Sequence, residues 1–371
     1  MTNGARTRIL AAAGALLLIS AACGTDDATS DGSPSDSDPQ PVSTTAEAPG
    51  TTLGEPPAVE TKVFVDDLGR EVEVPVNPQR VVFANGELAG MATTLGYQPL
   101  ALHDSYSSSE ESLQALGGLT PDLGQTTFLN SEELNLEALK ALEPDLLIWT
   151  PWLEPGDYDV IADEIAPVVA LEARANGTDA YTPGEDQGEQ YSKQRKVAEL
   201  VGVADALDGQ IAAYESQVDD VRERHGDLID QLEWTMLDLY GDGLAWMYGQ
   251  PAMTLNEVTV DIGLDPSTAM TEALQSPDNE TYLYASISAE RVPEFAADLV
   301  IVLVEDPTQS VADIDSGIDT LLSSTDAGAA GQVLVGDQLG WLTHNVQANM
   351  SVLEEIDAFL SEQGIANVGD F

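Results

Sequence analysis

The sequence predicts an α/β protein built from two similar α/β lobes joined by one long helix. Three features of the chain lead to this prediction: short apolar runs alternating with helical segments, one long amphipathic segment, and an internal repeat. The chain has 371 residues, 43% of them hydrophobic, which is enough for a sizeable core or for two medium domains.

The amino terminus predicts a lipoprotein signal peptide. Arg6 and Arg8 precede an apolar run from Ile9 to Ala22, which is too short to span a bilayer but suits a signal sequence. Small residues then lead to Cys23, the chain's one cysteine. We expect the signal peptide to be cleaved before Cys23 and this cysteine to be lipidated. The alternative is an ordinary secretory signal with an incidental cysteine. A lone cysteine rules out a disulfide framework.

Short apolar runs predict the strands. They are continuous rather than alternating, which favours strands covered on both faces. A hairpin with a turn near Gly69 precedes them. The expected strands are Val63–Val65, Val72–Val74, Val81–Phe83, Leu146–Trp149, Val168–Leu171, Met236–Tyr240, Leu299–Val304 and Val333–Val335, with helices at Glu87–Leu95, Leu136–Leu142 and Ser351–Leu360.

One amphipathic segment, from Ala206 to Leu232, is longer than most globular helices. Its apolar positions recur every three or four residues, and no proline interrupts it. Gly226 weakens it and could end it early. Such a helix could cap a single sheet or join two lobes.

An internal repeat favours two lobes. The segments 135–148 and 288–301 each place a capping residue, a glutamate two positions later, an aspartate ten residues after the cap, and then an apolar strand. The glutamates, Glu137 and Glu290, fall in the first helical turn, where the helix dipole favours an anion. Either one alone would be a routine surface residue, but their matched positions favour a shared docking role.

These features divide the chain into five parts. Residues 24–58 are rich in Asp, Ser, Thr, Pro and Gly and cannot bury enough surface to fold. We expect a signal peptide over 1–22, a disordered acidic tether over 23–58, an N-terminal lobe over 59–203, an inter-lobe helix over 204–231, and a C-terminal lobe over 232–371.

The charge balance excludes one class of partner. The chain has 65 acidic and 13 basic residues, for a net charge of -52, so nucleic acid is not an expected partner. Attraction at long range instead favours cations or neutral ligands. We expect a monomer.

Several motifs, in this order and spacing, resemble one known family. They are VDDLGREVEVP at 65–75, NPQRVV at 77–82, NLE at 135–137, PDL at 144–146, AELVG at 198–202 and ISAER at 287–291. Over roughly residues 60–365 the chain resembles the substrate-binding lipoproteins of iron–siderophore ABC importers, a group that includes haem and cobalamin binders. The resemblance implies a class III periplasmic-binding-protein fold with the ligand cleft between the lobes. It also implies that Glu137 and Glu290 pair with arginines of the membrane permease.

Ligand contacts are expected on loops that follow strand ends. Aromatic faces and an occasional arginine suit a bulky ferric chelate whose iron the siderophore already coordinates, and a Gly-rich stretch from Gly241 to Gly249 looks like such a loop. For each aromatic residue, core packing is the alternative. The candidate residues are Tyr106, Trp152, Arg174, Trp246, Tyr248 and Trp341. Scarce arginines and the acidic charge favour a neutral or cationic ferric hydroxamate over a triply anionic catecholate.

Other functions fit the sequence less well. Three histidines are too few for a zinc or manganese importer. His225 is expected to be solvated, whereas His103 or His344 could serve as an axial ligand if haem were bound. Cobalamin is a further alternative. The segment Asp313–Gly317 has a faint calcium-loop pattern that we interpret as an acidic turn.

An enzyme is the alternative from a different class, such as a lipid-anchored cell-surface hydrolase. The sequence has no G-x-S-x-G, H-E-x-x-H, Walker A or G-x-G-x-x-G motif in a fitting context. A purely structural lipoprotein would neither bind nor turn over a ligand. The sequence therefore predicts a non-enzymatic binding protein, without a cofactor of its own, held on the extracytoplasmic face of the cell membrane. The envelope type stays open.

Overall fold

The computed structural model divides the chain into two compact units, residues 1–56 and 57–371, and all described elements belong to the second. The described residues are 60–83, 86–102, 127–128, 136–150, 155–171, 191–241, 243–248, 254–276, 284–306, 308–343 and 345–363. The predicted signal peptide, Cys23 and the predicted tether over 23–58 lie outside them.

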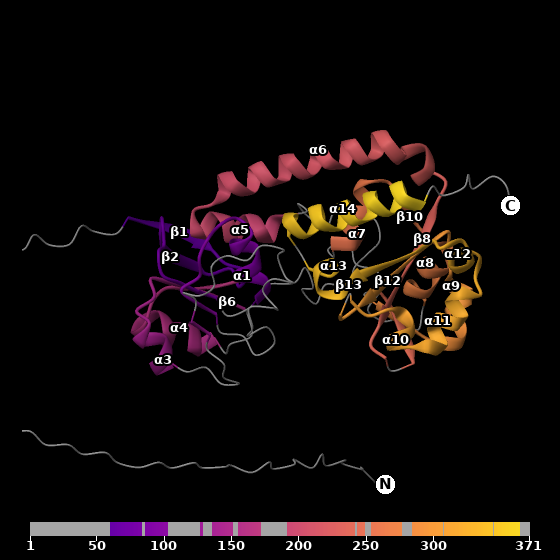
Figure 1. Cartoon of the computed structure of the whole chain (residues 1–371). Coiled ribbons are helices and arrows are strands. Elements are labelled where there is room, and N and C mark those ends of the chain that lie inside the picture. Colours follow the sequence, from indigo (N-terminus) through magenta and orange to yellow (C-terminus); the bar gives the residue numbers. More distant parts are fainter. Residues whose placement is uncertain are drawn as a thin grey trace, which may run out of the picture. The chain divides into compact units, whose positions relative to one another are not determined.

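The first lobe contains a parallel sheet and a separate hairpin (Figure 1). The hairpin pairs β1 (Thr61–Val65) with β2 (Glu71–Pro75) in antiparallel fashion. All strands of the five-stranded sheet run parallel, in the order β5-β4-β3-β6-β7. Their bounds are β3 Val81–Phe83, β4 Ala101–Leu102, β5 Thr127–Phe128, β6 Leu146–Trp149 and β7 Val168–Ala170.

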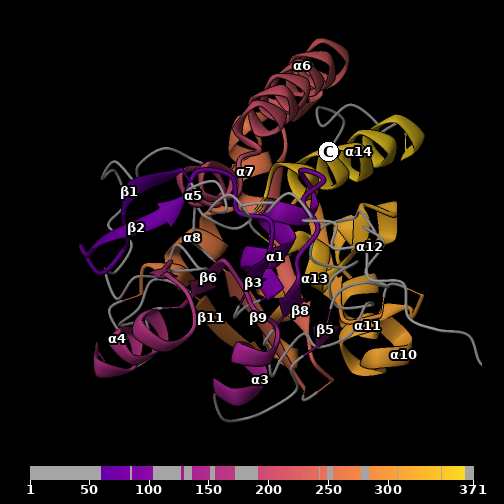
Figure 2. The ribbon, with the colours of Figure 1, turned by 90° about the vertical axis from the view of Figure 1, so that its left-hand side faces the viewer.

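Four shorter helices accompany these strands, as the end-on view in Figure 2 displays for several of them. They are α1 (Gly86–Thr93), α3 (Leu136–Ala141), α4 (Pro155–Glu164) and α5 (Ser192–Val201). Residues of β3, β6 and β7 are buried along their whole length. The prediction that these continuous apolar runs form strands covered on both faces is therefore confirmed.

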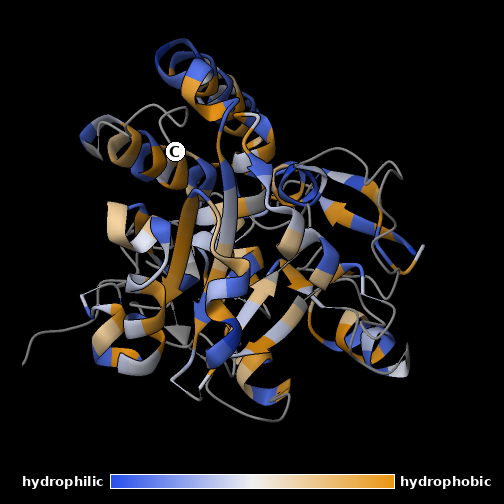
Figure 3. Cartoon of the chain, turned by 90° about the vertical axis from the view of Figure 1, so that its right-hand side faces the viewer, coloured by the Kyte–Doolittle hydropathy of each residue, from blue (hydrophilic) through white to orange (hydrophobic). Residues whose placement is uncertain are grey.

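The long helix α6 runs from Ala204 to Ile229. It continues through Gly226, so the expectation that this glycine could end the helix is wrong. The guanidinium group of Arg222 lies beside Gly226, and its Nη1 donates to Asp230 Oδ1 and Ile262 O, both at 2.8 Å. Figure 3 shows hydrophobic and hydrophilic residues alternating along α6, as expected of an amphipathic helix.

The second lobe has a mixed sheet. Its main order is β11-β9-β8-β12-β13, with β10 also pairing with β8. The pairs β8–β12, β12–β13 and β8–β10 are parallel, whereas β8–β9 and β9–β11 are antiparallel. The bounds are β8 Glu233–Leu239, β9 Leu244–Tyr248, β10 Asp265–Pro266, β11 Tyr284–Ser288, β12 Leu299–Val304 and β13 Val333–Asp337.

Helices surround this mixed sheet, and β12 is buried at every position. The last helix, α14, packs along α6 through Arg224 and His225, which both contact Asp357. The helices are α7 Thr254–Asp261, α8 Thr268–Leu274, η2 Ala289–Arg291, α9 Val292–Phe295, α10 Val311–Ile314, α11 Ser316–Ser323, α12 Asp326–Ala330, α13 Gln338–Trp341 and α14 Val346–Gln363.

One sequence expectation about this lobe is wrong. The stretch from Gly241 to Gly249 was expected to form a loop, but Leu244–Tyr248 forms strand β9. Gly241 and Gly243 have φ values of 72° and 78° and make the turn that joins β8 to β9. These left-handed conformations favour glycine, so the glycines mark a hairpin turn rather than a long loop.

The hairpin is fastened to the first lobe by Asp66. Its side chain is buried and accepts hydrogen bonds from the backbone N–H groups of Leu68, Arg70 and, 104 residues away, Ala170. The Arg70 guanidinium donates to the same carboxylate at 2.6 and 2.9 Å and lies 4.2 Å above the Tyr158 ring. Within the motif at 65–75, the D-x-x-x-R spacing therefore corresponds to the ion pair between Asp66 and Arg70, which is a structural contact and not a ligand contact.

We predict that Asp66→Ala lowers the free energy of unfolding by about 3–5 kcal/mol, because it removes the counter-ion of a partly buried guanidinium, whose Nη2 keeps only Val168 O, and leaves buried backbone donors without an acceptor. Urea denaturation followed by circular dichroism measures the change. As a control, Asp208→Ala removes the exposed Arg195–Asp208 pair and should cost about 0–1 kcal/mol. Equal effects of the two variants would contradict this account.

Candidate functional site

The internal repeat corresponds to two equivalent structural units. In the first lobe, α3 leads into β6; in the second, η2 and α9 lead into β12. Leu139 and Val292, at matching repeat positions, are both fully buried. The second copy begins with a 3-10 turn instead of an α-helix, and Pro293 lies at the start of α9. Proline lacks a backbone N–H and is accommodated at this position of a helix.

The aspartates of the repeat perform the same task in both lobes. Asp145 Oδ1 accepts a hydrogen bond from Arg80 N at 3.0 Å, just before β3 begins. Asp298 Oδ2 accepts one from Glu233 N at 2.9 Å, at the start of β8. In each lobe the aspartate therefore fixes the start of the parallel strand next to its own. The sequence match reflects this shared architecture.

The two candidate docking glutamates are both exposed. Glu137 lies in the first turn of α3, and Glu290 lies in η2. The expected capping bond from Ser288 is not formed, although Ser288 has the extended backbone of a capping residue. The residue Asn135, its counterpart, lies outside the described residues.

Glu290 sits at a defined edge of the second sheet. The backbone N–H of its neighbour Ala289 donates to Gly243 O at 3.1 Å, in the turn that follows β8. Since β8 and β12 are parallel, this is the edge at which their carboxyl ends lie. Ligands of α/β proteins bind at this edge, so Glu290 flanks the predicted ligand side of the lobe.

A buried carboxylate near the same edge was not anticipated from the sequence. Asp238, near the end of β8, is fully buried, and both its oxygens accept from Gln338 Nε2 at 2.8 and 2.9 Å. Trp246 is its cross-strand partner on β9. An aspartate in a chain with 65 acidic residues carries no distinguishing signal in the sequence.

The two candidate aromatic residues of β9 lie in a strand. Trp246 pairs with Asp238 on one side and Ser286 on the other, and its side chain is half-buried. Tyr248 follows two positions later, opposite Tyr284 of β11.

Trp341 occupies a core position instead. Its side chain is 1% exposed, packs against Gly336 of β13, and donates its indole N–H to Glu355 Oε2 at 2.9 Å. A side chain larger than hydrogen at position 336 would collide with the ring, which explains a glycine there. Core packing accounts for Trp341, which is therefore not a candidate ligand contact.

The remaining ligand candidates, Tyr106, Trp152 and Arg174, lie outside the described residues, as do His103 and His344. In the first lobe, the residues shortly after β3, β4, β6 and β7 are likewise not described. The described part of the candidate site therefore lies in the second lobe.

His225 is not solvated, contrary to expectation. Its side chain is 13% exposed, and its Nε2 lies 3.1 Å from Asp357 Oδ1 and 3.2 Å from Ser361 Oγ. These contacts of His225 link α6 to α14, and the packing of the two helices covers the imidazole.

The acidic turn at Asp313–Gly317 caps helices. Asp313 forms a reciprocal capping box with Ser310, and Asp315 accepts from Gly317 N and Ile318 N at the start of α11. Across the described ranges, no cluster of His, Cys, Asp or Glu side chains is suited to hold a metal ion. In those same ranges, no helix has both the length and the apolar composition to cross a bilayer.

Comparison with known proteins agrees with this architecture. The family model described as "Periplasmic binding protein" matches residues 81–338, which span both sheets. The chain belongs to the periplasmic binding protein family. Members of this family bind a ligand without converting it, so the chain is a binding protein and not an enzyme.

One curated protein is similar over much of the chain. It is the probable siderophore-binding lipoprotein YfiY of Bacillus subtilis, 23% identical over 244 residues, covering 65% of this chain and 68% of the relative.

Solved structures of the family share the fold. A FhuD-fold component of a Fep/Fec-like ferrichrome ABC transporter from Bacillus subtilis aligns with a TM-score of 0.60 and 20% identity, covering 81% of this chain and all of that one. Staphylococcus aureus SirA, complexed with staphyloferrin B, aligns at 0.57 with 19% identity, over 82% and 100%. Staphylococcus aureus FhuD2 with bound ferrioxamine B aligns at 0.57 with 15% identity, over 77% and 99%. The two-lobed α/β fold of class III binding proteins is therefore confirmed.

The contact between Trp341 and Glu355 predicts a pH dependence of stability. Burial raises the pKa of Glu355; the indole hydrogen bond lowers it, and the charge of Asp337 raises it. The native state therefore holds this proton more tightly than the unfolded chain, and stability falls as pH rises from the ordinary glutamate pKa through the raised one. The effect is small, because part of the carboxylate keeps contact with water.

We predict that Glu355→Gln, which stays neutral and keeps an acceptor for the indole, is more stable than wild type at pH 8. The difference should shrink toward pH 4, where Glu355 itself is protonated. Thermal unfolding at both pH values measures it. The neighbouring exposed Glu354→Gln serves as the control. A gain that is the same at both pH values would contradict the assignment.

Proposed function

We propose that the chain captures a ferric siderophore at the outer side of the cell membrane and delivers it to the permease of an ABC importer. The observation that carries this proposal is the repeated unit that presents Glu137 and Glu290, one exposed carboxylate per lobe, in a periplasmic binding protein fold. The functions of the similar proteins support the ligand class. They are siderophore binding, ferrichrome transport, and complexes with staphyloferrin B and ferrioxamine B.

In this proposal the ligand lies between lobes formed by residues 59–203 and 232–371, with helix 204–231 joining them. Trp246 and Tyr248 are the contacts from the second lobe, and Tyr106, Trp152 and Arg174 those from the first. Aromatic faces provide a large contact area at low entropy cost, which suits a bulky chelate. A joining helix with no break allows only a small closure around the ligand.

The preferred ligand is a neutral or cationic ferric hydroxamate. The buried carboxylate of Asp238 lies across the strand pair from Trp246, and the whole chain carries a net charge of -52. A triply anionic ferric catecholate would be repelled by this field unless several arginines offset it. Haem and cobalamin stay as alternatives within the same transporter class.

The two glutamates are proposed to contact arginines of the permease. An exposed carboxylate can accept two parallel hydrogen bonds from one guanidinium, which fixes orientation as well as affinity. One such contact per lobe lets the permease sense both lobes at once. Lipidated Cys23 and the tether over 23–58 would keep the protein, as a monomer, close to that permease.

Ligand binding is tested by tryptophan fluorescence on the segment from Val59 to Phe371. We predict saturable quenching by a submicromolar ferric hydroxamate and none by its iron-free form. Ferric catecholates, haem and cobalamin complete the panel. Quenching by haem alone would identify haem as the ligand, with His103 or His344 as its axial ligand. Silence across the panel would refute the siderophore proposal while leaving the fold intact.

Docking is tested by charge reversal in cells. We predict that Glu137→Lys with Glu290→Lys abolishes uptake of the ferric siderophore, because like charges would face the permease arginines, while the affinity for the siderophore is unchanged. Uptake of radiolabelled iron and the fluorescence titration measure the two quantities. Glu223→Lys, an exposed change on α6, is the matched control. Unchanged uptake in the double variant would refute the proposed docking role of the two glutamates.

A further inference from the structure

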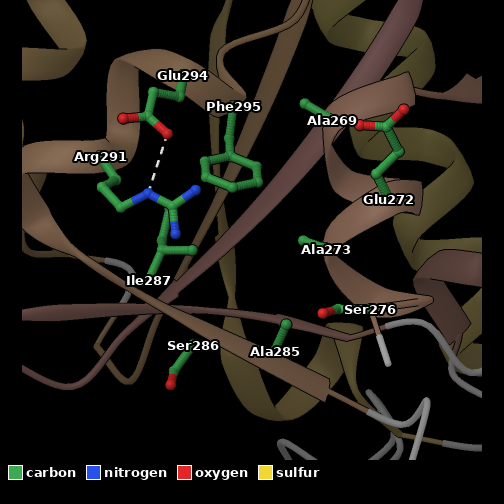
Figure 4. Close-up of a pocket in the computed structure, with 10 residues that line it drawn as sticks. All are labelled: Ala269, Glu272, Ala273, Ser276, Ala285, Ser286, Ile287, Arg291, Glu294 and Phe295. Carbon is green, nitrogen blue, oxygen red and sulfur yellow. Dashed lines mark hydrogen bonds and ion pairs between the residues drawn. The ribbon is translucent and has the colours of Figure 1, made fainter. Parts of the chain in front are cut away.

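An open pocket of about 610 Å³ lies in the second lobe beside Glu290. Its walls are α8 on one side and η2 with α9 on the other, and β11 runs between them. Figure 4 shows Glu272 on the α8 side, the Arg291–Glu294 pair opposite, and the Phe295 ring between them. Because Arg291 directly follows Glu290 in the chain, the pocket continues the surface on which the docking glutamate lies.

The floor and one wall of this pocket consist of small or apolar groups. Ala269 and Ala273 line the α8 wall, and both are only partly buried. Ile287 and Phe295, at 3% and 5% exposure, form the floor together with Ala285. Alanine side chains leave space between α8 and the sheet that larger residues would fill, so the pocket can accept side chains from outside.

The strand β11 exposes an edge in this pocket. It is the last strand in the sheet order, and its one partner among the described strands is β9. The three consecutive residues Ala285, Ser286 and Ile287 all line the pocket. Since successive side chains of a strand point to opposite faces, three in a row can line one pocket only where the edge of the backbone itself borders it. Such an edge can pair with an extended segment of another chain.

The charge of the pocket favours a basic occupant. Glu272, Glu290 and Glu294 are exposed around it. Among the described lining residues the one cation is Arg291, which donates through Nε to Glu294 Oε2 at 2.9 Å and lies 5.2 Å from the centre of the Phe295 ring. This pairing neutralises Glu294 and leaves Glu272 and Glu290 as the net charge at the rim. A partner with a positive side chain would complement them.

We propose that this pocket receives an extended segment of the importer permease, which lies along the edge of β11 and directs a basic side chain toward Glu272 and Glu290. An apolar side chain of the same segment occupies the space over Ala273. This inference rests on the proposed function and extends the contact at Glu290 into a larger docking surface on the second lobe. It also distinguishes the lobes, because the pocket is built from η2, α8 and β11 of the second one.

The test uses the full lipidated chain in cells that lack their own copy, with uptake of iron-labelled ferric hydroxamate as the readout. Ala273→Trp fills the pocket and Glu272→Lys reverses the rim charge. We expect each variant to lower uptake at least tenfold, with unchanged affinity for the ferric hydroxamate in the fluorescence titration. Ala213→Trp, at an exposed alanine of α6, is the matched control and should transport normally.

A second measurement separates docking from misfolding. A photo-crosslinking amino acid at exposed Ser286 should link the chain to a permease subunit in intact cells, whereas the same group at Ala213 should not. Uptake and crosslinking that are unaffected by Ala273→Trp would overturn the inference. A parallel loss of siderophore affinity or of thermal stability in both pocket variants would overturn it too. Failure of wild type to bind or import any siderophore would instead refute the proposed function.

Discussion

One buried amide, that of Gln194 in α5, hydrogen-bonds to both lobes and links them directly. Its Oε1 accepts from Val346 N, the first residue of α14, at 3.0 Å, and its Nε2 donates to Met91 O and Thr94 Oγ1. The side chain is 1% exposed. A backbone N–H at a helix start that loses its acceptor in such a position costs about 1–3 kcal/mol. One glutamine thus ties α1, α5 and the last helix of the second lobe together.

A buried polar cluster reinforces this junction. Asn349 of α14 donates to the hydroxyl of Tyr191, just before α5, and to Glu257 of α7, and Tyr214 of α6 donates to Asp261 of α7. Burial raises the pKa of both tyrosines far above their usual value, so both keep their protons at any physiological pH. The hydrophobic core also runs from Leu95, Tyr191 and Ala198 into the second lobe. The lobes are therefore joined by packing and hydrogen bonds in addition to α6.

This junction bears on the proposed docking of Glu137 and Glu290 to a permease. A permease that contacts one carboxylate on each lobe can read a small change only if the lobes are otherwise held in a defined arrangement. The lobes are held in this arrangement by the continuous helix α6, the amide of Gln194 and the contact between Tyr191 and Asn349. The acidic surface serves the same end, since charge steers a basic partner and fixes its orientation more than it raises affinity.

Local sequence determined strands β3, β6, β7, β8, β12 and β13, the long helix, and the repeated unit with its glutamate and aspartate, because continuous apolar runs, helical periodicity and matched spacing are local signals. Contacts between distant residues decided the rest. Leu244–Tyr248 became a strand because β8 and β11 lie on either side of it, Trp341 became a core residue because Gly336 and Glu355 receive it, and Asp66 found its partner 104 residues away. A side chain's type limits the bonds it can make, but only the folded chain sets which partners come within reach.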